Sequence, residues 1–150
     1  MNININTFNE WAKSNKDKKM ADGHYSSVML MIAMINENSS ILDKRFSFLD
    51  IGCGNGWVVR EFLNNNLCIN ATGIDGAKNM INKANSYNLG QFLNKDIEHY
   101  NFNKKFDIVF SMETFYYFSN PNKIINSIYQ NGIKKNGLFI IGLDHYKENK

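Results

Sequence analysis

The stretch "FLDIGCGNGW" at residues 48–57 decides the fold. An apolar run ends in the acid Asp50 and is followed by three glycines that alternate with other residues. Glycine permits tight turns and removes side chains that would block a ligand. The next residues, 57–65, place their apolar side chains at helical spacing, so the free N–H groups of a helix N-terminus would point the same way. We therefore expect a buried strand, a ligand-facing glycine loop and a helix.

Strand-like and helix-like segments alternate along the rest of the chain. Continuous apolar runs are typical of strands covered on both faces, and apolar residues three and four apart are typical of helices. The expected strands are residues 46–51, 68–75, 90–96, 106–112 and 137–143. The expected helices are residues 57–65, 77–87 and 121–131, and a more apolar one at 24–35 that would lie against the sheet or over its edge. This order predicts an α/β fold, a Rossmann-like doubly wound parallel sheet with helices on both faces.

The chain length and composition indicate one compact domain. We divide its 150 residues into an N-terminal helical cap, residues 1–45, and a core, residues 46–150. The net charge is +3, and the densest basic segment, "KSNKDKK" at 13–19, also holds an acid, so we interpret it as a solvated surface and expect no nucleic-acid partner. Two cysteines without metal-ligand spacing indicate neither a disulfide framework nor a metal site. No apolar run approaches the length of a membrane span, and a cytoplasmic location is expected.

The spacing of the glycines distinguishes two classes of ligand. A dinucleotide loop of the form G-x-G-x-x-G would require a third glycine at the position of Trp57. Asp75 ends the second expected strand about twenty residues after the loop, where an acid can hold both hydroxyls of a ribose. Alternatively, Asp75 caps the following helix. Asp96 closes the third strand, where an adenine amino group would lie.

Four segments together resemble successive motifs of class I S-adenosylmethionine-dependent methyltransferases. They are "FLDIGCGNGWVVREF", "TGIDGAKNMINKA", "NKDIEHYNFNKKFDIVFSMETFYYF" and "IKKNGLFIIGLD", within residues 46–143. The sequence is most similar to the small-molecule branch that includes the ubiquinone-biosynthesis type. By position, the resemblance implies cofactor contacts from Asp50, Gly52, Cys53, Gly54, Gly56, Asp75, Gly76, Asp96, Ile97, Ser111, Met112 and Glu113. It also implies that Tyr116 and Tyr117 lie near the methyl acceptor.

The expected function is transfer of a methyl group from S-adenosylmethionine to a small-molecule acceptor by in-line displacement. Positioning supplies much of the rate of such a step, and a base is needed only when the acceptor atom carries a proton. The candidate catalytic residues are His24, Tyr25 and His145. The segment "SMETF" lacks the prolines that amino-methylating nucleic-acid enzymes of this fold carry there. The alternatives are a cofactor-binding module or fragment without turnover and, less favoured, an NAD(P)-dependent oxidoreductase.

The C-terminal part departs from the family pattern. The family continues past the fifth strand with a helix and an antiparallel hairpin, whereas this sequence stops at Lys150. We therefore expect the hairpin to be missing and the sequence to be a fragment. The fifth strand would then present an apolar edge that a missing segment or a partner covers.

Overall fold

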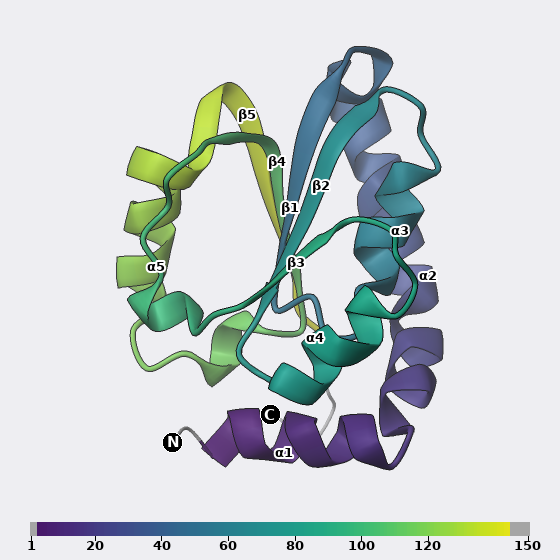
Figure 1. Cartoon of the computed structure of the whole chain (residues 1–150). Helices are drawn as coiled ribbons and strands as arrows, with labels where there is room; N and C mark the ends of the chain where they lie inside the picture. The colour runs from purple at the N-terminus through teal and green to yellow at the C-terminus, as the bar shows by residue number, and fades with distance from the viewer. Residues whose placement is uncertain (1–2, 145–150) are drawn as a thin grey trace.

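The computed structural model, which describes residues 3–144, contains a five-stranded parallel sheet (Figure 1). The strands are β1 (Phe46–Ile51), β2 (Cys68–Asp75), β3 (Gln91–Asn94), β4 (Phe106–Met112) and β5 (Ile133–Gly142). Their order in space is β3-β2-β1-β4-β5. From β1 the chain adds β2 and β3 on one side and then β4 and β5 on the other, so the strand order switches between β1 and β4. Ligands of open parallel sheets bind beyond the carboxyl ends of the strands at such a switch point.

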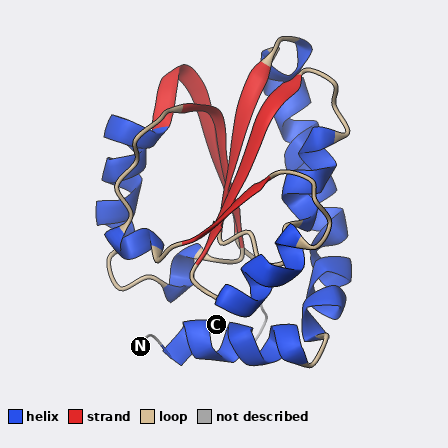
Figure 2. Cartoon of the chain, in the orientation of Figure 1, coloured by secondary structure: helices blue, strands red, loops and turns tan. Residues whose placement is uncertain are grey.

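Helices cover both faces of this sheet (Figure 2). They are α1 (Ile3–Lys13), α2 (Lys16–Asn38), α3 (Trp57–Leu63), α4 (Lys78–Asn85) and α5 (Pro121–Ser127). In Figure 1, α5 lies on one side of the sheet, α2 and α3 lie on the other, and α1 runs across the end of the molecule beside α4. The prediction of a Rossmann-like doubly wound parallel sheet is confirmed.

Two apolar layers hold the helices to the sheet, because neighbouring residues of a strand point to opposite faces. On the α3 side, the Phe48 ring stacks on Phe62 with centroids 3.8 Å apart, and Phe110 packs beside both. On the α5 side, Leu49 and its neighbours form a second buried cluster with Ile124. Burial on both faces explains why β1 and β4 read as largely apolar runs in the sequence.

The strand bounds expected for residues 46–51, 68–75 and 106–112 are those observed. The expected helix at 121–131 ends at Ser127 and continues as a π-helical turn, Ile128–Gly132. β5 begins at Ile133, earlier than the expected residue 137, and it forms an edge of the sheet. None of the helices within residues 3–144 combines the length and apolar character that a bilayer crossing requires.

Two expectations for the N-terminal segment need correction. The helix expected at 24–35 is part of the longer α2, and only one of its faces is buried, since Leu30 is 63% exposed and Met34 48%. The basic segment at 13–19 is not wholly solvated, because Asp17 is only 1% exposed. Its carboxylate lies 2.6 Å from Nζ of Lys83 and accepts a 3.0 Å hydrogen bond from Nδ2 of Asn55.

Candidate functional site

A pocket opens at the carboxyl ends of β1, β2 and β4, at the switch in strand order. The loop after β1 forms one wall, and the ends of β2 and β4 form others. Side chains from α1, including Ile5 and Phe8, close it from outside. The pocket therefore lies where the fold predicts a ligand.

The glycine loop shapes this pocket through left-handed backbone conformations. Gly52, Gly54 and Gly56 have φ values of +75°, +51° and +77°, which other residues rarely adopt. A Cβ at Gly56 would lie 2.4 Å from the Phe92 ring, so this position also needs glycine for packing. At Gly54 such a Cβ would have the Met20 methyl group as its nearest non-neighbouring atom within residues 3–144, 3.9 Å away, so the backbone borders open space on the pocket side.

Asp50 lies buried at the base of the pocket, 3% exposed. Its backbone is in register with Gly73 of β2 and Phe110 of β4, which fixes it at the centre of the sheet. Among the described residues, its carboxylate has no hydrogen-bond partner. Burial and the nearby charge of Asp75 raise the pKa of Asp50 to about 8. A buried carboxylate in this state favours a cation as its neighbour.

Asp75 fastens the glycine loop to the start of α4. Its carboxylate accepts hydrogen bonds from the backbone N–H of Gly54 at 2.9 Å and of Ala77 at 2.7 Å. Burial raises the pKa of Asp75, although these two hydrogen bonds oppose the rise. The alternative that Asp75 caps the following helix is therefore realised in the structure. Each carboxylate oxygen keeps further acceptor capacity toward the pocket.

Asp17 connects the second helix to the same loop. Burial raises the pKa of Asp17, but the hydrogen bonds from Lys83 and Asn55 outweigh this and hold it below its ordinary value. Asn55 belongs to the loop: its side-chain oxygen accepts from the backbone N–H of Trp57 at 3.3 Å, and its backbone carbonyl accepts from Arg60 at 2.8 Å. The loop is thus held by α2 as well as by β2.

The structure brings most of the predicted site residues to this pocket. They are Asp50, Gly52, Cys53, Gly54, Asp75, Gly76, Asp96, Ile97, Met112, Glu113, Tyr117 and His24. Asp96 also caps the short turn that follows it, accepting from the backbone N–H of Glu98 at 3.0 Å.

Other predicted residues lie away from the pocket lining. Gly56 lies beneath α3 against Phe92, and Ser111 is fully buried and donates to the Ile51 carbonyl at 2.8 Å. Tyr116 is half exposed and donates to Glu113, while Tyr25 is half exposed and packs on Trp57. None of these four residues belongs to the lining of the pocket. His145 lies outside the described residues.

The sequence interpretation missed the part of the lining that α1 supplies. Ile5 contacts Gly76, since a Cβ there would lie 2.7 Å from the Ile5 Cδ1 atom. Phe8 packs edge-on against Tyr117, with ring centroids 5.3 Å apart. Ile5, Phe8 and Ala12 recur at three- and four-residue spacing, and this pattern is the signal that predicts a helix with one apolar face.

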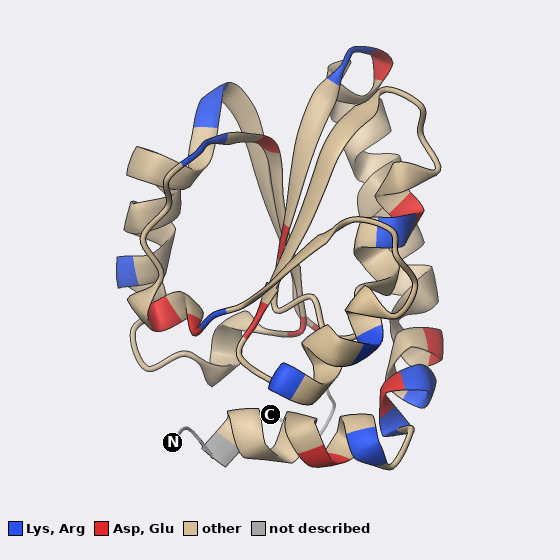
Figure 3. Cartoon of the chain, in the orientation of Figure 1, with Lys and Arg blue, Asp and Glu red and all other residues tan. Residues whose placement is uncertain are grey.

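Charged residues are distributed unevenly around the site (Figure 3). Acidic segments occur within the central sheet as well as on helices, whereas Lys and Arg lie on helices, on turns and on β5. The pocket thus holds the carboxyl groups of Asp50 and Asp75, which when ionised attract a cation and repel a phosphate.

Comparisons with known proteins give consistent results. The model of the family described as "Methyltransferase domain" matches residues 49–141. A malonyl-[acyl-carrier protein] O-methyltransferase of Acetivibrio thermocellus is 30% identical over 141 residues, which are 89% of this chain and 46% of the relative. A second such protein, from Ilyobacter polytropus, is 32% identical over 110 residues, 69% of this chain and 42% of the relative. This chain thus spans less than half the length of these two relatives.

Solved structures share the fold. A chain in the complex of the Haloferax volcanii Trm112 methyltransferase activator has a TM-score of 0.78 and 26% identity, over 95% of this chain and 62% of that one. The DhpI–SAH complex has a TM-score of 0.74 at 18% identity, over 91% of this chain and 65% of that one, and shows the likeness of fold alone. With the family model matching well over half of its residues, this chain belongs to the methyltransferase-domain family.

Proposed function

We propose that this chain binds S-adenosylmethionine in the pocket and transfers its methyl group to a small-molecule acceptor. One observation carries the proposal: the buried carboxyl group of Asp50 and the partly buried one of Asp75 line a single pocket beside the glycine loop. S-Adenosylmethionine offers a sulfonium, an ammonium and two ribose hydroxyls, and these groups complement the two carboxylates.

The residues present fit the parts of this cofactor. Asp50 would pair with the cationic methionine end, and the open space beside Gly54 would admit it. Asp75 would accept from the ribose hydroxyls through the lone pairs that its backbone hydrogen bonds leave free. Ile97 and Asp96 would frame the adenine. The bound cofactor supplies an activated methyl group, and the residues of this chain orient it toward the acceptor.

The same charges disfavour a dinucleotide. A pyrophosphate would place its negative charge beside the carboxyl groups of Asp50 and Asp75, and Trp57 stands where the third glycine of a dinucleotide loop is required. A nicotinamide oxidoreductase is therefore the weaker alternative.

The acceptor class comes from the relatives. Those described above are named malonyl-[acyl-carrier protein] O-methyltransferases, and we propose methylation of an oxygen atom of a small acyl or comparable molecule. Of the expected acceptor and catalytic residues, Tyr117 and His24 line the pocket and are retained in this proposal.

We also propose a cytoplasmic location and a cap role for residues 1–45. Cys53 and Cys68 are free thiols, which suits a reducing compartment. α1 and α2 supply pocket-lining residues that would cover the cofactor. β5 is an edge strand, and its edge is where a further segment or a partner would add.

Calorimetric titration tests the cofactor assignment. We expect S-adenosylmethionine to bind with one site per chain, NADH not to bind, and Asp75→Asn to weaken binding at least tenfold. Asp43→Asn, a substitution in the short turn Ile41–Asp43 before β1, serves as the control. Absence of binding by folded protein, or tight NADH binding, would reject the assignment.

Turnover is tested separately, with methyl-labelled cofactor and a metabolite extract as the acceptor pool. Label transfer to a small organic product supports catalysis. Cofactor binding without any transfer would show instead that this chain is a binding module.

A further inference from the structure

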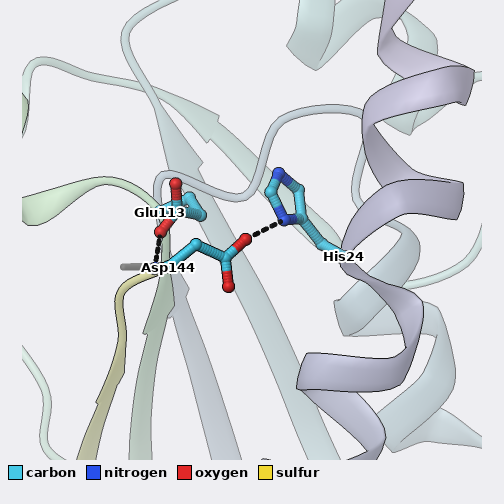
Figure 4. Close-up of side chains that lie close together, drawn as sticks. All are labelled: His24, Glu113 and Asp144. Carbon is cyan, nitrogen blue, oxygen red and sulfur yellow. Dashed lines mark hydrogen bonds and ion pairs between the residues drawn. The ribbon is translucent and has the colours of Figure 1, made fainter. Parts of the chain in front are cut away.

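Three side chains from distant parts of the sequence meet at the rim of the pocket. His24 comes from α2, Glu113 follows β4, and Asp144 follows β5 (Figure 4). Nδ1 of His24 lies 3.2 Å from Oδ2 of Asp144, and Oε1 of Glu113 accepts a hydrogen bond from the Asp144 backbone N–H. One nitrogen or oxygen atom from each side chain lies within 4.8 Å of the other two.

The histidine nitrogen in this cluster is buried without a well-aligned hydrogen bond. Nδ1 of His24 is enclosed and has no hydrogen-bond partner within residues 3–144, so its contact with Asp144 is an electrostatic approach of two polar atoms. A buried nitrogen left in this state costs free energy unless a proton or a cation lies between it and the carboxylate. The His24 side chain is 18% exposed and that of Asp144 34%, so bulk water contributes little to satisfying it.

The spacing suits a bound metal ion. Two neighbouring ligands of an octahedral ion at about 2.1 Å are separated by roughly 3.0 Å, close to the observed 3.2 Å between His24 and Asp144. The widest separation in the cluster is within 4.8 Å, which a small rotation of one carboxylate would reduce. One imidazole and two carboxylates form a donor set that Mn²⁺ and Zn²⁺ accept, with coordination positions left over.

The existing hydrogen bonds are compatible with coordination. Glu113 accepts from Tyr116 at 2.8 Å and from the Asp144 backbone, and Ser27 approaches the other Asp144 oxygen at 3.5 Å. Ionised carboxylate oxygens have about two acceptor directions each, so these contacts do not use up their capacity. Such contacts orient metal ligands in known sites.

We propose that His24, Glu113 and Asp144 form a divalent-cation site at the rim of the pocket. This reverses the expectation of no metal site, which rested on cysteine spacing alone. His24 and Glu113 also line the pocket, so an ion held by them would face its interior and bind an acceptor oxygen in an open position. Only this last role rests on the proposed function; binding of the ion does not.

The chain contains a matched control for the histidine–aspartate pair. Nδ1 of His99 also lies 3.2 Å from a carboxylate oxygen, that of Asp96, but the His99 side chain is 81% exposed. The grouping of three metal-ligating side chains found within residues 3–144 does not include His99. If a histidine beside an aspartate were sufficient to bind the ion, the exposed pair would bind as well.

The experiment uses the full chain, stripped of metal with a chelator and without cofactor. MnCl₂ is titrated and followed by electron paramagnetic resonance of free Mn²⁺, and ZnCl₂ is titrated by calorimetry. We expect one saturable site per chain, at least tenfold weaker binding in His24→Gln and Asp144→Asn, and unchanged binding in His99→Gln. Circular dichroism tests whether each variant is folded. If Asp144→Asn does not fold, His24→Gln alone decides the result.

Three results would overturn the proposal. They are no saturable binding of either ion, equal binding by folded His24→Gln, and loss of binding in His99→Gln. A parallel titration with S-adenosylmethionine separates failure of the ion site from failure of the proposed function. If the chain binds S-adenosylmethionine but no ion, only the cation-site proposal is rejected.

Discussion

Replacing Asp50 with Asn should make the chain more stable at neutral pH while weakening its affinity for the cofactor. Asp50 has a pKa of about 8 in the folded chain, because it is buried and lies near the charge of Asp75, against an ordinary value of 3.8. Between these values the folded state holds a proton that the unfolded state has released. The free energy of unfolding therefore falls as pH rises through this window and levels off above about pH 8.

The size of the effect follows from the width of that window. At pH 7 the solution is about three pH units above the ordinary pKa, which corresponds to a destabilisation on the order of 4 kcal/mol at about 1.4 kcal/mol per unit. Asn has nearly the same shape and does not ionise, so Asp50→Asn removes this cost. Its buried amide needs hydrogen bonds, so the net gain should be smaller, about 1–3 kcal/mol.

Urea unfolding between pH 3 and pH 9 measures the prediction. The midpoint for the unaltered chain should fall with rising pH, and that for Asp50→Asn should change much less. Asp107→Asn is a control of opposite sign: burial raises the pKa of Asp107, but hydrogen bonds from Lys134 and Ser47 outweigh it and lower the pKa. That variant should lose about 1 kcal/mol at neutral pH, and the difference should vanish as pH falls below about 4.

Calorimetry completes the test on the binding side. Loss of a charge-assisted contact of about 1.5–3 kcal/mol corresponds to roughly 10- to 100-fold weaker S-adenosylmethionine binding by Asp50→Asn. The reasoning would be refuted if Asp50→Asn kept the pH slope of the unaltered chain, or if it bound the cofactor with unchanged affinity.

Two further predictions concern the loop and its support. Gly56→Ala should destabilise the chain by more than about 2 kcal/mol, because φ is +77° and the new Cβ would lie 2.4 Å from Phe92. In contrast, Gly23→Ala should stabilise it by about 0.5–1 kcal/mol, since Gly23 lies within a helix with nothing within 4 Å of the new atom; thermal unfolding compares the two. Asp17→Asn should cost about 2–3 kcal/mol in urea unfolding near pH 7, because its pairing with Lys83 is buried. This cost should disappear as pH falls through the lowered pKa of Asp17, and an unchanged difference at pH 3 would contradict its cause.

The central strands and the glycine loop could be predicted from the sequence because their signals are local. β1 and β4 are buried along almost their whole length, so each reads as an apolar run whose ends coincide with the ends of the strand. The acids at the ends of β1 and β2 are fixed by that register and reach the pocket as expected. β5 begins earlier than expected, because its first residues, "IKKN", include polar residues that mask the strand pattern.

The contacts of the N-terminal cap, residues 1–45, and of the pocket rim could not be predicted in the same way, because they join segments that are distant in the sequence. Asp17 is buried by pairing with Lys83, which lies 66 positions further along the chain. A lysine-rich run gives no sign of this pairing. The proposed divalent-cation site likewise joins residues 24, 113 and 144, and no spacing motif in the sequence links these three residues. Tyr116 shows the converse: the resemblance implies a place near the acceptor, and in the structure the 3-10 turn Phe115–Tyr117 directs its hydroxyl to Glu113.

The two buried carboxylates connect the stability of the apo chain with its function. Asp50 and Asp75 are held close together by strand register and by the backbone hydrogen bonds of Asp75, so neither can move away without breaking the glycine loop. Burial raises both pKa values, and the charge of Asp75 raises that of Asp50 further, which is a cost to the folded state that a cationic ligand offsets when it binds. Ligand binding and stability are therefore coupled through the same charges. It follows that the stabilisation by S-adenosylmethionine should be largest where Asp50 is easily ionised, near and above pH 8, and that Asp50→Asn should remove this pH dependence together with most of the stabilisation.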